Sequence, residues 1–245
     1  MRFKKHLNEG IFDKIFGKGK DKEEKSTVSD YLIQNVLEGT YIHPESDIKA
    51  IKDIKFYTME LEGGKKPVHE YLAKKDIVGS QKEPGFKQLM DALLENPNFS
   101  NALDGYKDTP LHILAAKVPL NSSLAYKVLY HKAATNLNSW HVSPLHILAH
   151  RGWKYILSVK ESAIVKDDEG NTPAHYLALY MRQHKQITKE DIEDFKNKLL
   201  GKMPTNNKDY TPIDILEYDW ALKSVSHISY KQMIPYYVEF APEFP

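Results

Sequence analysis

The middle of the chain repeats one short pattern of polar and apolar positions. In residues 104–116 a polar turn leads to Thr109, which is a suitable helix N-cap, and to Pro110, which suits the first helical turn. Apolar residues that include Leu114 then fall on one face of the predicted helix. Three further copies of the pattern occupy residues 143–149, 172–178 and, more faintly, 211–216. The pattern therefore predicts four helices that each begin at a proline.

A second position keeps the same register. The sixth residue before each proline is a turn former whose side chain bonds its own backbone. These residues are Asp104, Asn138, Asp167 and Asn206. The intervals between successive prolines are 34, 29 and 39 residues, so the copies are divergent. A fifth copy is predicted at residues 66–73, although Lys66 replaces the capping hydroxyl residue and Leu61 replaces the turn former.

This pattern resembles the ankyrin repeat, whose period is about 33 residues and whose mark is T-P-L-H-x-A. The resemblance covers roughly residues 60–225 and also places Gly64 at the consensus glycine of the fifth copy. It implies an all-α, ankyrin-repeat-like solenoid of four to five divergent helix-turn-helix units with helical caps. It further implies a non-catalytic module that binds another protein.

The flanking segments complete the predicted organisation. Residues 1–27 form an amphipathic and basic segment followed by a charged, flexible stretch, and residues 28–100 form a helical N-terminal cap that includes the degenerate repeat. Residues 101–225 contain the repeats, and residues 226–245 form a C-terminal capping segment. Further helices are expected at residues 30–37, 47–59, 84–96, 122–131, 153–158 and 188–200.

Composition excludes several classes of function. The chain has 34 basic and 33 acidic residues and a net charge of +1, so no nucleic-acid partner is expected. It has no cysteine, which excludes disulfides and thiolate metal sites. No apolar run approaches the ~18 residues of a membrane span, and the N-terminus lacks a secretory signal. We expect a cytoplasmic protein without a cofactor.

The histidines raise the question of catalysis. His112, His146 and His175 each follow a motif proline by two residues, and the resemblance implies that they bond backbone within and between turns. His150 lies four residues after His146, but no glutamate and no third ligand complete a metal site. Phosphate-binding loops and nucleophile elbows are also missing. A non-enzyme is favoured, and an enzyme that uses His146 and His150 remains the alternative.

Two rows of residues are candidates for binding a partner protein. The first lies on the turns that would project as fingers. It consists of Tyr106, Lys107, Trp140, His141 and Tyr210. Aromatic residues beside basic ones are typical binding anchors, and the alternative is that they pack against adjacent fingers.

The second row follows the motif histidine or its equivalent. It consists of Ile113, Ile147, Tyr176 and Ile215. These residues are expected to form an apolar stripe along a concave groove that seats an amphipathic partner helix. The alternative is that curvature or the N-terminal helices already cover the stripe.

The first ten residues are similar to the capsid-targeting peptides of tailed bacteriophages of the T-even type. Those peptides are basic and amphipathic and end at Leu or Ile, any residue, then Glu, which here are Leu7, Asn8 and Glu9, with cleavage before Gly10. The resemblance implies a bacteriophage protein packaged in the head that binds or inhibits a host protein in the host cytoplasm. The alternatives are a structural component of the virion head, an N-terminal helix on a membrane surface, and an N-terminal helix docked on the repeats.

Overall fold

The computed structural model describes residues 28–39, 42–199, 201–219 and 221. Within them the regular structure consists of 11 α-helices and four short 3-10 helices, with no strand, which confirms the all-α class. The α-helices are α2 (Val28–Glu38), α3 (Pro44–Lys52), α4 (Lys55–Thr58), α5 (Pro67–Lys74), α6 (Phe86–Glu95), α7 (Pro110–Lys117), α8 (Ser123–Leu129), α9 (Pro144–His150), α10 (Pro173–His184), α11 (Lys189–Lys198) and α12 (Pro212–Glu217). The 3-10 helices are η1 (Glu62–Gly64), η2 (Gly79–Lys82), η3 (Lys154–Ser158) and η4 (Lys160–Ala163).

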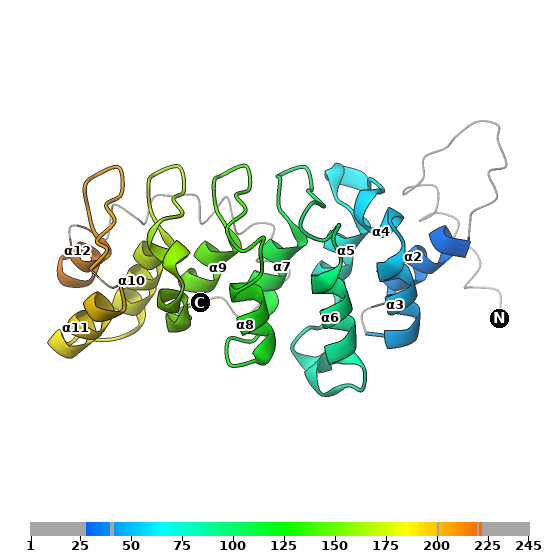
Figure 1. Ribbon diagram of the computed structural model, residues 1–245, viewed down its shortest axis with the longest axis horizontal. Coiled ribbons are helices and arrows are strands. Elements are labelled where there is room, and N and C mark those ends of the chain that lie inside the picture. The colour runs from blue at the N-terminus through cyan, green and yellow to red at the C-terminus, as the bar shows by residue number, and fades with distance from the viewer. Residues whose placement is uncertain (1–27, 40–41, 200, 220, 222–245) are drawn as a thin grey trace.

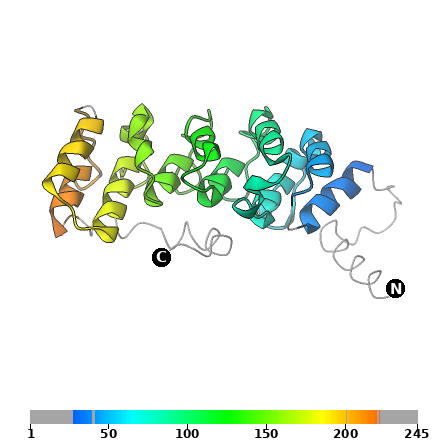
Figure 2. The same ribbon diagram turned by 90° about the horizontal axis from the view of Figure 1, so that it is seen from below.

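Five of the six described helices that begin at a proline form a row. They are α5, α7, α9, α10 and α12, and each packs against the next. The residue before each proline is extended, so the chain enters the helix from a loop, and proline supplies a backbone torsion suited to the first turn. Figure 1 shows the elements following one another in chain order along the longest axis, and Figure 2 shows the same order from below.

A five-residue loop precedes each of these helices, and a single residue separates the loop from the proline. We call these the finger loops and number them 1 to 5: residues 61–65, 104–108, 138–142, 167–171 and 206–210. In each loop the amide of the first residue donates to the carbonyl of the fifth, and the amide of the fourth donates to the carbonyl of the first. The fourth residue is left-handed in all five, and the loops project to the same side (Figure 1).

Finger loop 1 departs from the sequence motif but keeps this geometry. The Leu61 amide donates to the Lys65 carbonyl at 2.8 Å, and the Gly64 amide donates to the Leu61 carbonyl at 3.1 Å. Gly64 has φ 75°, a value that glycine adopts without strain. Residues 61–74 therefore share both the loop and the proline-initiated helix of the other four copies.

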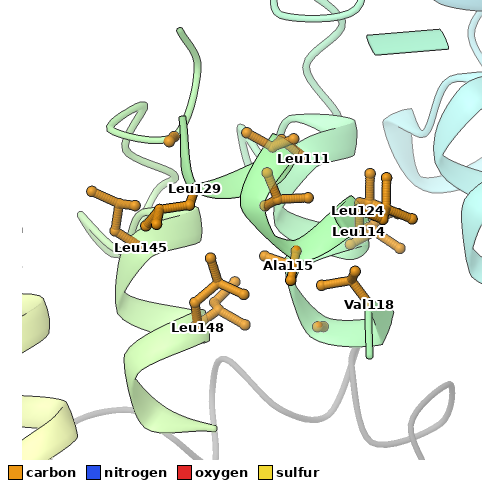
Figure 3. Close-up of a cluster of buried hydrophobic side chains, with 14 of the residues drawn as sticks. Leu111, Leu114, Ala115, Val118, Leu124, Leu129, Leu145 and Leu148 are labelled. Atoms are coloured by element: carbon orange, nitrogen blue, oxygen red, sulfur yellow. The ribbon is translucent and has the colours of Figure 1, made fainter. Parts of the chain in front are cut away.

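The core lies between the proline-initiated helices and the elements beside them. Figure 3 shows part of it, where buried side chains of α7 meet those of α8 and α9. The labelled residues are Leu111, Leu114, Ala115, Val118, Leu124, Leu129, Leu145 and Leu148. Because each helix buries leucines against the next unit, these contacts stabilise the row as a whole.

Three expected helices differ from the structure. Residues 47–59 are not one helix, because Asp53 is extended and its carboxylate accepts the Lys55 amide at 2.8 Å, which separates α3 from α4. Helix α6 begins at Phe86 rather than at Pro84, because Gly85 is left-handed with φ 84°. The segment after Trp153 is the 3-10 helix η3.

Other expected helices agree with the structure. Helices α2 and α8 correspond to the segments predicted at 30–37 and 122–131. Helix α11 begins with the predicted capping box, in which Thr188 accepts the Asp191 amide at 3.2 Å and Asp191 accepts the Thr188 amide at 3.1 Å. The predicted segments 1–27 and 226–245 lie outside the described residues. Within the described part of the chain, each helix is too short or too polar to cross a membrane.

Candidate protein-binding surface

The finger loops are held in place by buried histidines at the third position of the proline-initiated helices. Nδ1 of His112 accepts the Thr109 amide at 3.0 Å, and Nε2 donates to the Val142 carbonyl at 3.0 Å. Because Nδ1 accepts, the proton must lie on Nε2. Nε2 of the other three histidines makes the same bond to a backbone carbonyl of the next unit. His69 bonds the carbonyl of Asp108 at 2.8 Å, His146 that of Asn171 at 3.1 Å, and His175 that of Tyr210 at 2.9 Å.

Burial keeps these histidines neutral. It lowers the pKa of His69, His112, His146 and His175 to about 4. In α12, Asp214 replaces the histidine and accepts the Thr211 amide at 2.7 Å. The predicted structural role of His112, His146 and His175 is confirmed by these bonds.

His146 does not have the geometry of a metal ligand or a catalytic base. Both of its ring nitrogens are engaged inside the core, with Ser143 and Asn171. The ring of His150 packs 6.0 Å from that of Tyr176. No group of three His, Asp or Glu side chains among the described residues could hold a metal ion.

Polar side chains at the first position shape finger loops 2 to 5. Oδ1 of Asp104 accepts the amides of Tyr106 and Asp108, each at 2.8 Å. Asn138, Asp167 and Asn206 accept the equivalent amides in their own loops. The turn-forming role predicted for these four residues is therefore confirmed.

The aromatic candidates of finger loops 2 and 3 contact each other. The rings of Tyr106 and Trp140 stack, with centroids 5.2 Å apart and planes at 24°. The Ser139 amide donates to the Tyr106 carbonyl at 2.8 Å, which ties the two loops together. Tyr106 is still 47% exposed and Trp140 is half-buried. The pair is thus both packed between fingers and open to a partner, and its binding role stays a prediction.

The basic candidates beside this pair are exposed on an unusual backbone. Lys107 has φ 61° and His141 has φ 55°, in the left-handed region that favours glycine. The same position is glycine in finger loops 1 and 4. The His141 ring also pairs with Asp168 of finger loop 4, and both side chains are more than half exposed.

The candidate in finger loop 5 is less open. Tyr210 is half-buried and packs against the hydrophobic core. Its carbonyl accepts the bond from His175. Finger loop 5 is also tied to finger loop 4, because the Asn207 amide donates to the Glu169 carbonyl at 2.8 Å. Its role in binding stays a prediction.

The second candidate row is not exposed. Ile113, Ile147, Tyr176 and Ile215 are between 0% and 6% exposed and belong to the buried core. Their predicted exposure as a concave apolar stripe is wrong, because proline-initiated helices that pack side by side enclose these side chains. Tyr176 is further fixed by its hydroxyl, which donates to Asp167 at 2.7 Å.

A second set of bonds between units has no counterpart in the sequence predictions. Lys117 donates to the carbonyls of Leu72, Ala73 and Lys75 at 2.6–2.9 Å, at the C-terminal end of α5. Arg151 caps α7 in the same way, with the carbonyls of Ala115 and Val118 at 2.7–2.8 Å. Both cations lie seven residues after a motif proline, which is the signal that could have found them. Burial lowers the pKa of Lys117 to about 8.

Comparison with known proteins does not identify the chain. No protein-family model matches it, and no curated protein matches it. Glu9 and Gly10, the predicted processing site, lie outside the described residues.

Proposed function

We propose that this chain is a divergent ankyrin-type solenoid that binds another protein through the tips of finger loops 2 and 3. Five units with the same loop geometry and the same proline-initiated helix support the repeat assignment. Histidine bonds from one unit to the next give the row the nearest-neighbour coupling expected of a repeat array.

The observation that carries the proposal is the exposed Tyr106–Trp140 stack beside left-handed Lys107 and His141. A non-glycine residue in the left-handed region costs on the order of 1 kcal/mol relative to glycine. Finger loops 1 and 4 avoid that cost with Gly64 and Gly170, whereas finger loop 5 carries it at Asp209. The basic side chains at this position in finger loops 2 and 3 lie next to two aromatic rings, which supports a use for them in binding.

The site has the chemistry of a protein anchor rather than that of a catalyst. Two stacked rings offer a rigid apolar surface at small entropic cost, and the flanking Lys107 ammonium group steers an acidic or polar partner. Both ring nitrogens of His146 are engaged in structural bonds, which favours binding over the alternative of catalysis by His146 and His150.

The resemblance of residues 1–10 to phage capsid-targeting peptides supports a bacteriophage origin and a host protein as the partner. On this proposal the protein is carried in the head, is cut after Glu9 and acts in the host cytoplasm. The second candidate function is a structural component of the virion head, which is favoured by the same ten residues. The copy number in purified virions separates the two, because a structural component saturates a fixed number of sites.

The test is a comparative affinity capture with the full chain as bait. We expect a host protein that binds the wild-type chain and is lost from the Tyr106→Ala/Trp140→Ala variant. The matched control is Tyr31→Ala in α2, which removes a ring of similar exposure (63%) far along the chain from the fingers. Equal capture by all three baits would place binding elsewhere and contradict the proposal.

A further inference from the structure

A second group of exposed aromatic side chains lies on α8 and η3 rather than on the finger loops. Tyr126 lies in α8 and Tyr130 is the C-cap residue of that helix. Because they are four residues apart, they lie on the same face. The Tyr126 ring packs 5.3 Å from that of Tyr155 in η3, and the Tyr130 hydroxyl lies 3.3 Å from Oγ of Ser158. Two elements of successive units therefore form one continuous surface.

These rings are open to solvent although they are large and partly apolar. Tyr126 is 38% exposed, Tyr130 64% and Tyr155 49%. Trp153 forms a buried floor, 5.1 Å from Tyr126 between ring centroids. A rigid aromatic group held in place by its own contacts is the kind of surface that anchors a partner.

The stretch of chain that carries these rings is basic, although the exposed Glu161 follows it directly. Residues 109–160 contain no aspartate or glutamate, although the chain as a whole is nearly balanced, with 34 basic and 33 acidic residues. The basic residues of this stretch are Lys117, Lys127, Lys132, Arg151, Lys154 and Lys160. Lys117 and Arg151 cap helices, and Lys127 pairs with Asp91 of α6.

The other three cations are exposed and lie close to the tyrosines or to Ser158 in the sequence. Lys154 adjoins Tyr155, Lys132 follows Tyr130 by two residues, and Lys160 follows Ser158 by two. We propose that Tyr126, Tyr130 and Tyr155, together with the exposed lysines Lys132, Lys154 and Lys160 close to them in sequence, form a tyrosine patch that binds an acidic segment of a partner protein. The phenol hydroxyls and ammonium groups donate to carboxylates, and the ring edges receive apolar side chains of the segment.

The geometry favours a protein segment over a nucleic acid. Single-stranded nucleic acid needs ring faces that are separate enough for successive bases to stack on them. Here the rings of Tyr126, Trp153 and Tyr155 cover one another, with centroids 5.1–5.9 Å apart and planes at 57–73°. Three exposed lysines also fall short of the 6–10 phosphate contacts typical of strong backbone binding.

This surface goes beyond the proposed function, because it is formed by other residues than the fingertips. The test selects short peptides from a displayed random library on the immobilised full chain. We expect the selected peptides to be enriched in aspartate and glutamate together with an apolar residue. The affinity of the strongest synthetic peptide is then measured by fluorescence anisotropy on variants whose thermal unfolding matches that of the wild type.

The tyrosine patch predicts which variants weaken peptide binding and which do not. Tyr130→Ser/Tyr155→Ser and Lys154→Glu/Lys160→Glu should each weaken the peptide at least about tenfold. The controls Tyr31→Ser and Lys189→Glu should leave it unchanged, and so should the fingertip variant Tyr106→Ala/Trp140→Ala. That last result also separates this surface from the fingertip site.

Three results would overturn the tyrosine patch. The first is selection that enriches no acidic peptide. The second is a selected peptide that binds the patch variants as well as the wild type. The third is an oligothymidylate that binds more tightly than the peptide and loses affinity in the patch variants, which would show a nucleic-acid surface instead.

Discussion

His112 donates from Nε2 to the carbonyl oxygen of Val142 at 3.0 Å and thereby fastens one proline-initiated helix to the finger loop of the next unit. The ring is fully buried, and its other nitrogen accepts the Thr109 amide. One side chain therefore caps its own helix and positions the loop that carries Trp140. Placement of the candidate binding residues depends on bonds made one unit away.

Replacing this histidine tests that coupling. His112→Ala leaves the buried Thr109 amide without a partner and removes one of the two bonds that the Val142 carbonyl accepts, so we expect a loss of about 3 kcal/mol in the free energy of unfolding. Urea unfolding followed by circular dichroism measures it. The control His184→Ala alters an exposed ring and should change stability by less than about 0.5 kcal/mol. Similar values for the two variants would contradict the role of the buried bond.

Acid should destabilise the protein at pH values well above those at which carboxylates usually titrate. The folded pKa of His69, His112, His146 and His175 is about 4, below the unfolded value of about 6.5. The unfolded chain therefore binds more protons, and stability is lost as the pH falls from 6.5 towards 4. We expect a loss on the order of 1 kcal/mol per histidine between pH 7 and 5.5. Urea midpoints that stay constant over this range would contradict it.

Asp104 should have the opposite pH dependence, because its ionisation lowers the stability of the folded protein as the pH rises. Burial, followed by the nearby Asp108 carboxylate, raises the pKa of Asp104 to about 6, and its Oδ2 is buried without a hydrogen-bond partner among the described residues. Asn138 and Asn206 occupy the same position in finger loops 3 and 5. Asp104→Asn should therefore raise stability by about 1–2 kcal/mol at pH 7, with no gain at pH 4.

The comparison for this variant is Asp168→Asn, which changes an exposed carboxylate of finger loop 4. Its effect should stay within about 0.5 kcal/mol. Thermal and urea unfolding at both pH values measure the two variants. A loss of stability in Asp104→Asn at pH 7 would mean that the ionised carboxylate is favourable where it lies.

The repeating unit could be predicted from sequence because its signals are local. Thr109 and Pro110 set a helix start whatever surrounds them, and Asp104 bonds its own loop. Finger loop 1 could be predicted even without those residues, since Gly64 and Pro67 supply the same backbone torsions. Each of these choices depends on a few neighbouring residues.

What sequence reasoning missed depends on contacts between units. Ile113 and Ile147 lie on helix positions whose exposure is decided by the adjacent helix, and the structure buries them. Lys117 and Arg151 donate to helix ends some 33–45 residues earlier in the chain, which no local pattern specifies. The proximity of Tyr126 and Tyr155 likewise arises only when α8 and η3 are placed side by side.

The most direct test of the fingertip account measures stability and binding on one variant, Lys107→Gly. Glycine relieves the left-handed backbone at φ 61°, so we expect a gain of about 1 kcal/mol in the free energy of unfolding. If the side chain serves binding, the same variant should bind the partner captured by the wild-type chain at least about tenfold more weakly. A variant that is more stable and binds as well as the wild type would show that Lys107 has no part in the interaction and would contradict the account.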